Sequence, residues 1–376
     1  MNNKETIRVL HVTEMLSAAG IESFIMNNYR NINRDKVQFD FLVLRNEKEF
    51  YDDEIKSLGG IKYYVHSEKK NTLLRILDES QQIKKFLKNN KYDIIHVHYT
   101  TPLRAFYLKA AKEAGVPVRI YHSHSAEVLG KSRIKLFIYN FCKHNMKRWG
   151  THFFACSRAA ADWMYPKDLI KTKQVKILHN GIDTNRFEFD DKIRREKRNE
   201  LKLDKKFVLI NTGRFTEQKN QSFILDIIIK LKSKGVDIKL LLLGEGPLEN
   251  EYREKVNRLG LGDEVIFLGV RKNVQDYLFA ADCFVMPSLY EGLPVAAIEA
   301  QCTGIPCVLS TNITDEAKIT ENVMLLNLNN SIDEWQKTIL NMQQMQREKA
   351  VYKIRDAGYD IKNVAKRMEE FYLSVI

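Results

Sequence analysis

The chain has 376 residues, of which 44% are hydrophobic and 29% are charged. A single hydrophobic core does not usually reach this size, so we expect two domains. With only 17 glycines and 7 prolines, the composition excludes a collagen-like or low-complexity chain and is typical of a globular protein.

The net charge of +12 is concentrated in the first half of the chain. Residues 1–190 contain 32 basic and 21 acidic side chains, whereas residues 191–376 contain 28 and 27. This one-sided positive field suggests a polyanionic partner, such as nucleic acid, anionic lipid or a phosphorylated substrate. The five cysteines form no Cys-x-x-Cys pair, so we expect reduced thiols.

No apolar run of signal-peptide length opens the sequence. No stretch approaches the roughly 20 apolar residues that a membrane-spanning helix needs. We therefore expect a cytoplasmic protein, and any contact with the inner face of the plasma membrane would be peripheral.

Short apolar runs alternate with amphipathic stretches in the first half, for example the helical pattern over residues 73–90. Strand, helix and strand at this spacing predict a parallel sheet covered on both faces. The predicted strands of this half are residues 7–12, 37–44, 61–65, 92–98, 116–122, 151–157 and 175–181.

The polar run 190–206 interrupts this pattern and predicts the end of the first domain and a solvated helix. A second α/β series follows, with the helical pattern 220–235 among its helices, and residues 331–376 are helical with a break near 357–359. The predicted strands of this half are residues 207–213, 238–246, 265–269, 283–288, 305–310 and 322–328.

Ligands of open α/β sheets bind beyond the carboxyl ends of the strands, so the loops after the strands are the candidate sites. In the loop NTGRFTEQKN (211–220), Arg214 and Lys219 lie beside a predicted helix start, which favours an anion site. The alternative is an ordinary turn with solvated charges. The loop GEGPLENEY (244–252) lacks the dinucleotide spacing G-x-G-x-x-G and is equally well explained as a tight turn.

Histidines cluster at two strand ends, His96 with His98 and His122 with His124. A His-x-His pair on a strand points both rings to one face, so zinc is an alternative, with Asp93 or Glu127 as a third ligand. We favour polar side chains lining a cleft, with one histidine near the reacting atoms and no bound metal.

The segment PSLYEGLPVAAIEA (287–300) places Glu291 and Glu299 on either side of a turn and a helix start. Carboxylates among apolar residues need partners. Two acceptors at this spacing suit the hydroxyl groups of a sugar. The alternative is a helix-capping glutamate followed by an ion-paired one.

Four motifs in this order resemble the family-4 retaining glycosyltransferases of the GT-B fold, in the bacterial exopolysaccharide and capsule branch. They are AAGIESFIMNNYR (18–30), HNGID (179–183), GRFTEQKN (213–220) and the E-x7-E of residues 291–299. The resemblance implies two Rossmann-like parallel-sheet domains facing a central cleft, with a C-terminal helix returning to the first domain. We expect an acceptor domain over 1–185 with the helix 360–376, and a nucleotide-sugar domain over 186–359.

The resemblance also implies roles for matching residues. Glu299 would bind the ribose hydroxyls, Glu291 the transferred sugar, and Arg214 with Lys219 the diphosphate. His124, with His122 as the alternative, would be the active-site histidine. Further donor contacts would come from Gly20, Val270, Arg271, Gly292, Leu293, Pro294 and Val295. The family's Gly-Gly is Ala19-Gly20 here, which could tighten donor selection.

These roles imply transfer of a sugar, with retention, from a nucleotide sugar to a lipid-linked saccharide or a glycan. The family branch favours UDP over GDP. Two fixed cations stabilise the leaving diphosphate, and the sequence has no Asp-x-Asp motif, so we expect neither a metal nor another cofactor. The alternatives are a GT-B nucleotide-sugar epimerase or hydrolase, and a basic nucleic-acid-binding protein.

The segment 131–150 has the pattern of a basic amphipathic helix with aromatic residues. Such a helix suits an anionic membrane surface, where a lipid-linked acceptor would be presented. The alternative is a helix that faces the core and has a solvated basic face.

Overall fold

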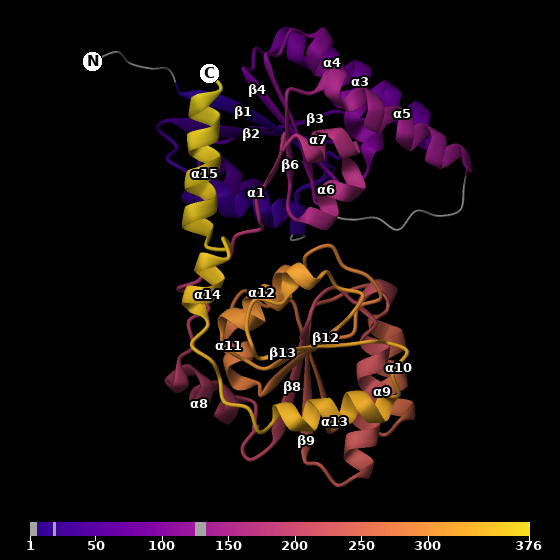
Figure 1. Ribbon diagram of the computed structural model, residues 1–376, viewed down its shortest axis with the longest axis vertical. Coiled ribbons are helices and arrows are strands. Elements are labelled where there is room, and N and C mark those ends of the chain that lie inside the picture. The colour runs from indigo at the N-terminus through magenta and orange to yellow at the C-terminus, as the bar shows by residue number, and fades with distance from the viewer. Residues whose placement is uncertain (1–5, 18–19, 125–132) are drawn as a thin grey trace. The chain divides into compact units, whose positions relative to one another are not determined.

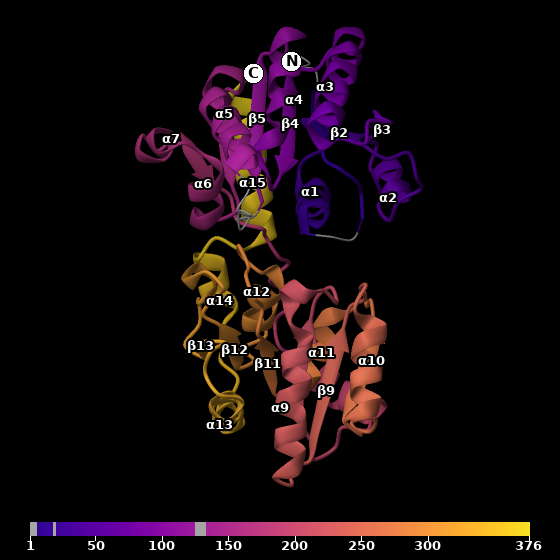
Figure 2. The same ribbon diagram turned by 90° about the vertical axis from the view of Figure 1, so that its right-hand side faces the viewer.

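The computed structural model describes residues 6–17, 20–124 and 133–376, and residues 133–135 by their backbone alone. The chain forms two compact units (Figures 1 and 2). The first contains the residues up to Gly181 together with Ile361–Ile376, and the second contains Ile182–Asp360. The chain passes between the units within HNGID and again just before its last helix.

The first unit is built on a seven-stranded parallel sheet in the order β3-β2-β1-β4-β5-β6-β7. All seven predicted strands are confirmed, although all but the first are shorter than predicted. The strands are β1 (Ile7–Val12), β2 (Val37–Val43), β3 (Lys62–Tyr64), β4 (Ile94–Tyr99), β5 (Val118–Ser123), β6 (His152–Ala155) and β7 (Val175–Ile177). The helices are α1 (Gly20–Asn31), α2 (Asp52–Ser57), α3 (Thr72–Asn89), α4 (Ala105–Glu113), α5 (Arg133–Trp149), α6 (Arg158–Met164), α7 (Lys167–Lys171) and α15 (Ile361–Ser374), with a 3-10 turn at Pro102–Arg104.

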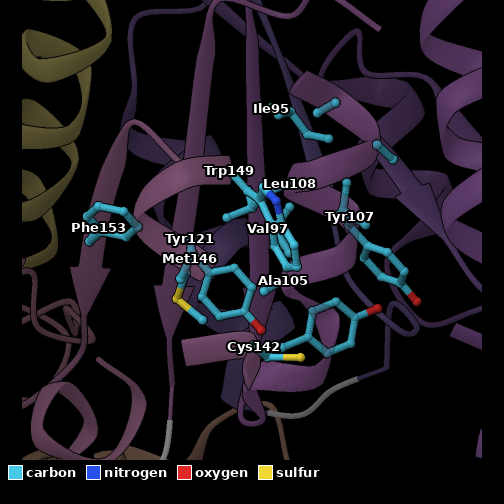
Figure 3. Close-up of a cluster of buried hydrophobic side chains, with 14 of the residues drawn as sticks. Ile95, Val97, Ala105, Tyr107, Leu108, Tyr121, Cys142, Met146, Trp149 and Phe153 are labelled. Carbon is cyan, nitrogen blue, oxygen red and sulfur yellow. The ribbon is translucent and has the colours of Figure 1, made fainter. Parts of the chain in front are cut away.

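Alternate residues of these strands face opposite sides of the sheet. One side packs against α3, α4 and α5, where Ile95 and Val97 of β4 meet Leu108 and Met146 (Figure 3). The other side packs against α1 and α15, the yellow helix of Figure 1. The predicted return of the C-terminal helix to the first unit is therefore confirmed.

The second unit contains a six-stranded parallel sheet in the order β10-β9-β8-β11-β12-β13. All six predicted strands are confirmed. The strands are β8 (Phe207–Thr212), β9 (Ile238–Leu243), β10 (Val265–Gly269), β11 (Cys283–Met286), β12 (Cys307–Ser310) and β13 (Val323–Leu326). The helices are α8 (Asp191–Glu200), α9 (Gln221–Ser233), α10 (Glu249–Arg258), α11 (Val274–Ala280), α12 (Val295–Cys302), α13 (Ile332–Met342) and α14 (Val351–Asp356), with 3-10 turns at Glu217–Lys219 and Asp315–Ala317.

Helix α8 is the predicted solvated helix, and none of its residues is buried. Arg194 Nη2 lies 2.6 Å from Asp282 Oδ1, and Arg198 Nη1 lies 3.2 Å from Asp282 Oδ2. Because Asp282 directly precedes β11, these ion pairs hold α8 to the second sheet. The expectation that this segment ends the first domain was wrong.

Each sheet has one point where successive connections leave in opposite directions. It lies between β1 and β4 in the first unit and between β8 and β11 in the second. Such topological switch points, beyond the carboxyl ends of the strands, are where open parallel sheets bind ligands. The loop of Arg214 and Lys219 follows β8, and the loop of Glu291 follows β11. The histidines of β1 and β4 adjoin the other switch point.

Candidate active site

Lys219 and Glu291 form an ion pair at the switch point of the second sheet. Lys219 ends the 3-10 turn after β8, and Glu291 lies in the loop between β11 and α12. Lys219 Nζ is 2.5 Å from Glu291 Oε1, and the two side chains keep 20% and 9% of their surface exposed. The pair is thus a largely enclosed, charge-assisted hydrogen bond, which holds both groups in fixed positions.

Hydrogen bonds to backbone carbonyls join the two loops that carry this pair. The Leu289 amide donates to the Gln218 carbonyl at 2.8 Å, and Gln218 Nε2 donates to the Tyr290 carbonyl at 3.0 Å. Asn220 Nδ2 donates to the Pro287 carbonyl at 3.1 Å. Asn220 adopts φ 54°, a left-handed conformation that asparagine tolerates better than most residues. The geometry of the ion pair therefore depends on the loops as well as on the two side chains.

Two glycines of the loop GEGPLENEY, Gly244 and Gly246, pack directly against the backbone of the Arg214 loop. A Cβ at Gly244 would lie 2.1 Å from the Gly213 carbonyl oxygen, and one at Gly246 would lie 2.4 Å from that of Phe215. The Phe215 amide also donates to the Glu245 carbonyl at 2.9 Å. These glycines thus permit close approach between two protein loops, which agrees with the interpretation of this segment as a tight turn.

Arg214 is exposed, and among the described residues its guanidinium has no hydrogen-bond or ion-pair partner. It stands five residues before Lys219, whose charge is already opposed by Glu291. Arg214 therefore offers a free set of donors to an anion at the end of β8.

Glu299 lies in the second turn of α12 and keeps part of its surface accessible. Burial raises the pKa of its carboxyl to about 7, and the nearby positive charge of Arg186 acts in the opposite direction. No hydrogen bond to this carboxylate is found within the described ranges. A half-ionised acceptor without a partner is suited to take hydrogen bonds from hydroxyl groups.

Arg186 is a residue of this site that sequence reasoning missed. Its Nε donates to Gln275 Oε1 at 2.8 Å, and its Nη2 donates to the Lys272 carbonyl. It therefore braces the start of α11 just beyond Val270 and Arg271, both of which are exposed. The signal that could have found it is its position three residues after HNGID.

The turn before α12 has mostly buried side chains. Gly292, Leu293 and Pro294 are buried, and Val295 is half-buried at the start of α12. The Glu291 amide donates to the Asn312 carbonyl at 3.4 Å, which ties the turn to the loop after β12.

The first unit brings five histidine rings together, those of the buried His11, His96, His98 and His122 and of the partly buried His124. His98 Nε2 is 2.9 Å from His11 Nδ1, and His98 Nδ1 is 2.9 Å from His124 Nε2. A second row joins Tyr372 Oη to His96 Nδ1 at 2.7 Å and His96 Nε2 to His122 Nδ1 at 3.3 Å. The two His-x-His pairs thus lie side by side, because β4 and β5 are neighbours in the sheet.

Burial lowers the pKa of every ring in this cluster, to about 3 for His11 and for His124. The values for His96, His98 and His122 lie well below 6.5 for the same reason, with a smaller contribution from neighbouring rings. All five rings are therefore neutral at pH 7. His11 lies near the end of β1, on the same side of the sheet as the other four histidines. The sequence predicted the strand 7–12 but did not indicate that His11 joins this cluster.

Within the described part of the chain, two groups of three histidines place ring nitrogens within 4.8 Å of one another, within reach of a single metal ion. They are His11 with His96 and His98, and His98 with His122 and His124. Asp93 belongs to neither group and is exposed at the amino end of β4, so its suggested role as a third ligand was wrong. Glu127, the other suggestion, lies outside the described residues.

The remaining predicted residue, Gly20, opens α1 in the first unit. A Cβ there would meet no atom within 4 Å, so the surrounding fold does not by itself require glycine. Ala19 lies outside the described residues. Glu22, in the first turn of α1, accepts a hydrogen bond from Thr13 Oγ1 at 3.3 Å, and burial raises the pKa of its carboxyl to about 7.

The sequence matches two family models, Glycosyltransferase Family 4 over residues 18–186 and Glycosyl transferases group 1 over residues 192–357. It is also 34% identical over 368 residues to EpsF of Bacillus subtilis, named as a glycosyltransferase, which covers 95% of this chain and 94% of that protein. The chain belongs to the family-4 glycosyltransferases. CapH of Staphylococcus aureus, named as a capsular polysaccharide biosynthesis glycosyltransferase, is 24% identical and covers 98% of this chain and 99% of its own.

The glycosyltransferase fold is also found among solved structures. Anabaena HepE in complex with UDP and glucose superposes with a TM-score of 0.75 at 17% identity, over 98% of this chain and 100% of that one. WaaG, a glycosyltransferase of lipopolysaccharide biosynthesis, gives a TM-score of 0.70 at 13% identity, over 96% and 99%. The predicted GT-B fold and glycosyltransferase function are confirmed, whereas the epimerase, hydrolase and nucleic-acid-binding alternatives find no support among these relatives.

Proposed function

We propose that this glycosyltransferase takes a sugar from a UDP-sugar and transfers it, with retention and without a metal ion, to a lipid-linked saccharide or a glycan of an exopolysaccharide or capsule. The observation that carries the proposal is the Lys219–Glu291 pair beside the free Arg214 at the switch point of the second sheet. The UDP bound to HepE supports the choice of base. An Escherichia coli relative, 25% identical over 84% of this chain and 82% of its own, is named as a galactosyltransferase that uses UDP-Gal and a diphosphoundecaprenol acceptor.

Lys219 and Glu291 can act on the donor together without separating. An ammonium group has three protons. One is directed to Glu291 Oε1, which leaves two for oxygens of the diphosphate. Glu291 likewise keeps lone pairs for a hydroxyl of the sugar that is to be transferred. The ion pair thus places a phosphate donor and a sugar acceptor side by side before the substrate arrives.

The nucleoside half of the donor would be held by Glu299 and by the loop after β10. The ribose hydroxyls donate to the Glu299 carboxylate, and the base lies on the loop of Val270 and Arg271, which Arg186 braces. The turn Gly292, Leu293, Pro294 and Val295 lines the sugar and the phosphates. Of these residues, Val270 and Arg271 are exposed and Glu299 is partly accessible.

In the reaction, the bond between the anomeric carbon and the diphosphate oxygen breaks, and negative charge builds on the leaving diphosphate. Arg214 and Lys219 stabilise this charge, which removes the need for a divalent cation. The acceptor hydroxyl forms the new bond on the same face, and its proton passes to the leaving phosphate oxygen. The anomeric configuration is therefore retained without a protein base.

The first unit would supply Gly20 and His124. Of the two candidate histidines, His124 is the better supported, because it lies just beyond the end of β5 and keeps part of its surface, whereas His122 is fully buried. Gly20 stands at the first turn of α1, where an added side chain would not collide with the fold. Gly20 thus begins the helix that follows β1, and His124 directly follows β5.

Helix α5 supports peripheral attachment to an anionic membrane. None of the helices that the structure describes has both the length and the apolar character to cross a bilayer. Cys142, Met146 and Trp149 face the core, so the core-facing interpretation holds for that side of α5. A second side of α5 exposes 74% of Phe137 and 47% of Phe141, although the Phe141 ring also contacts Trp149 edge-on. Exposed aromatic residues on a helix that also carries basic residues suit insertion among anionic headgroups.

Not every basic residue of this segment is available to a membrane. The Lys143 ammonium lies 4.4 Å from the centre of the Trp163 ring, and Lys147 pairs with Asp168. Arg148 is exposed. Lys131 lies outside the described residues, and the side chains of Arg133 and Lys135 are not described. The aromatic pair Phe137 and Phe141 therefore carries the argument more than the count of charges does.

A panel of UDP-sugars and GDP-sugars tests the proposal. We expect one or more UDP-sugars to raise the melting temperature of the protein, and mass spectrometry to detect a lipid-linked product one sugar heavier than the acceptor. If no nucleotide sugar stabilises the protein, the proposed donor class is wrong. If a donor is only hydrolysed whatever the acceptor, the proposed transfer is wrong.

A further inference from the structure

Three of the clustered histidines form a single hydrogen-bonded chain across three neighbouring elements. His11 lies near the carboxyl end of β1, His98 lies on β4, and His124 directly follows β5. The two links of this chain, His11 Nδ1 to His98 Nε2 and His98 Nδ1 to His124 Nε2, are both 2.9 Å long. The terminal nitrogens, His11 Nε2 and His124 Nδ1, are buried, and neither has a hydrogen-bond partner among the residues that the structure describes.

The number of protons in this chain limits its arrangements to two. Since each neutral imidazole carries one N–H group, three rings supply three protons. Each of the two hydrogen bonds between the rings uses one proton, so one proton remains for the two terminal nitrogens. Either His11 Nε2 carries it and His124 Nδ1 presents a lone pair, or the reverse holds. Reversing the direction of the chain reverses the tautomer of all three rings.

The surroundings of His11 favour the first arrangement. The ring of His11 packs against Phe39 with 4.1 Å between ring centres and lies 5.9 Å from Phe41, whereas Phe24 lies farther from the ring of His124, at 5.2 Å. An N–H group beside aromatic rings makes a weakly favourable contact, whereas a lone pair there gains nothing. A proton on His11 Nε2 leaves Nδ1 to accept from His98 Nε2–H, and His98 Nδ1 then accepts from His124 Nε2–H.

We propose that His98 and His11 are positioning residues that fix His124, the histidine assigned to the reaction in the proposed function, as its Nε2–H tautomer with the lone pair on Nδ1. The part that His124 plays in the reaction rests on the proposed function, but its tautomer does not. Neither His11 nor His98 touches the substrate in this proposal, since both act only through the ring of His124.

The second row of the cluster provides a matched control. His96 lies on the same strand and the same side as His98 and is equally buried. Its hydrogen bonds run to Tyr372 and His122 and include none to His124. A change at His96 therefore disturbs the packing of the cluster without breaking the chain that ends at His124.

The direct test is the tautomeric state of each ring, measured by long-range ¹H–¹⁵N correlation spectra of the full-length, ¹⁵N-histidine-labelled protein without substrate. We expect His11, His98 and His124 all to be protonated on Nε2, with the same spectrum after treatment with a chelator. A proton on His124 Nδ1, or averaging between its two tautomers, would overturn the proposal. A spectrum that changes on chelation and returns with Zn²⁺ alone would show a metal site in its place.

Variants of His98 extend the test. We expect His98→Phe to let His124 populate both tautomers, and His98→Asn to restore the single tautomer, because the amide oxygen stands where Nδ1 accepts. His96→Phe should leave His124 unchanged. An unaltered His124 in a folded His98→Phe protein contradicts the proposal. Should His98→Phe fail to fold, the spectrum of the unmodified protein still decides.

The kinetic consequence separates positioning from mere packing. With a UDP-sugar identified by the donor panel, His98→Phe should lower kcat by about tenfold, the effect of one misdirected hydrogen bond, and leave the KM for the donor within about twofold. His98→Asn should recover most of the loss. Equal losses in His98→Phe and His96→Phe would assign both residues a packing role only. If no UDP-sugar is found to be a donor, the proposed function fails, but the tautomer measurement still tests this proposal because it uses no substrate.

Discussion

Lys219 Nζ and Glu291 Oε1 lie 2.5 Å apart although 72 positions separate the two residues in the chain. The strand order brings them together, because β8 and β11 are neighbours in the second sheet and a loop leaves each at its carboxyl end. The family resemblance implied that Lys219 binds the diphosphate and that Glu291 binds the transferred sugar. Their direct contact means that the two roles are coupled, and a change at either residue will affect the other.

Replacement of Lys219 should mainly affect the reaction step. In Lys219→Ala the leaving diphosphate loses one of its two cations, so we expect kcat to fall by about 10²–10³-fold and the KM for the donor to change far less. Steady-state kinetics with the donor found in the panel measures both constants. Lys234→Ala, which removes an exposed lysine of the same unit, should keep the activity of the unmodified protein. A Lys219→Ala enzyme with normal kcat would remove this residue from the mechanism.

Donor affinity should depend on pH through Glu299. Burial raises the pKa of this carboxyl to about 7, and ribose hydroxyls donate to its ionised form. The site is therefore mostly protonated at pH 6 and mostly ionised at pH 8. We expect the Kd for UDP-glucose, which does not itself titrate in this range, to be about tenfold weaker at pH 6 than at pH 8. Calorimetry at both pH values gives the ratio, and Glu299→Gln should bind weakly at both. The same tenfold change in Glu299→Gln would assign the pH dependence to another group.

Arg186 should act on the nucleoside end of the donor. Its hydrogen bonds to Gln275 and to the Lys272 carbonyl hold the loop after β10, and its charge lowers the pKa of Glu299. In Arg186→Ala we expect a KM for the donor about 3–10-fold higher with a nearly unchanged kcat, because one or two hydrogen bonds are lost. The pH midpoint of donor binding should also move upward. Arg195→Ala on α8, an exposed arginine away from this loop, is the control, and a midpoint that stays in place in Arg186→Ala would contradict the electrostatic role.

The aromatic side of α5 should govern binding to membranes. Replacing Phe137 and Phe141 by serine removes apolar surface that would insert among lipid headgroups, so we expect partitioning onto vesicles rich in phosphatidylglycerol to fall at least about tenfold. Flotation with vesicles measures the bound fraction. Leu74→Ser removes a residue of α3 that is 56% exposed and should have no effect. Equal binding of the double variant and the unmodified protein would mean that α5 is not the contact.

Periodicity predicted all thirteen strands because parallel strands buried on both faces form continuous apolar runs. It could not predict which strands are neighbours, and this neighbourhood creates both the Lys219–Glu291 pair and the five-histidine cluster. His11 was missed because a single histidine in an apolar strand has no local signal. Arg186 was missed because its partners, Gln275 and the Lys272 carbonyl, lie far along the chain and include a backbone group.

Helix α5 illustrates the limit of amphipathic patterns. The pattern predicted a basic face and an apolar face, and it left open which of them meets the core. In the structure the apolar residues divide between two sides, with Cys142 and Met146 inside and Phe137 and Phe141 outside. Lys143 turns toward the Trp163 ring and does not contribute to a basic face. Only the neighbouring elements decide between such arrangements.

The central claim is that a nucleotide sugar binds at the switch point of the second sheet, and a crystal structure of the full-length protein with UDP tests it most directly. We predict diphosphate oxygens within about 3 Å of the Arg214 guanidinium and of Lys219 Nζ, with the ribose hydroxyls hydrogen-bonded to Glu299. A UDP molecule whose diphosphate contacts neither cation, or whose ribose lies away from Glu299, would contradict the account.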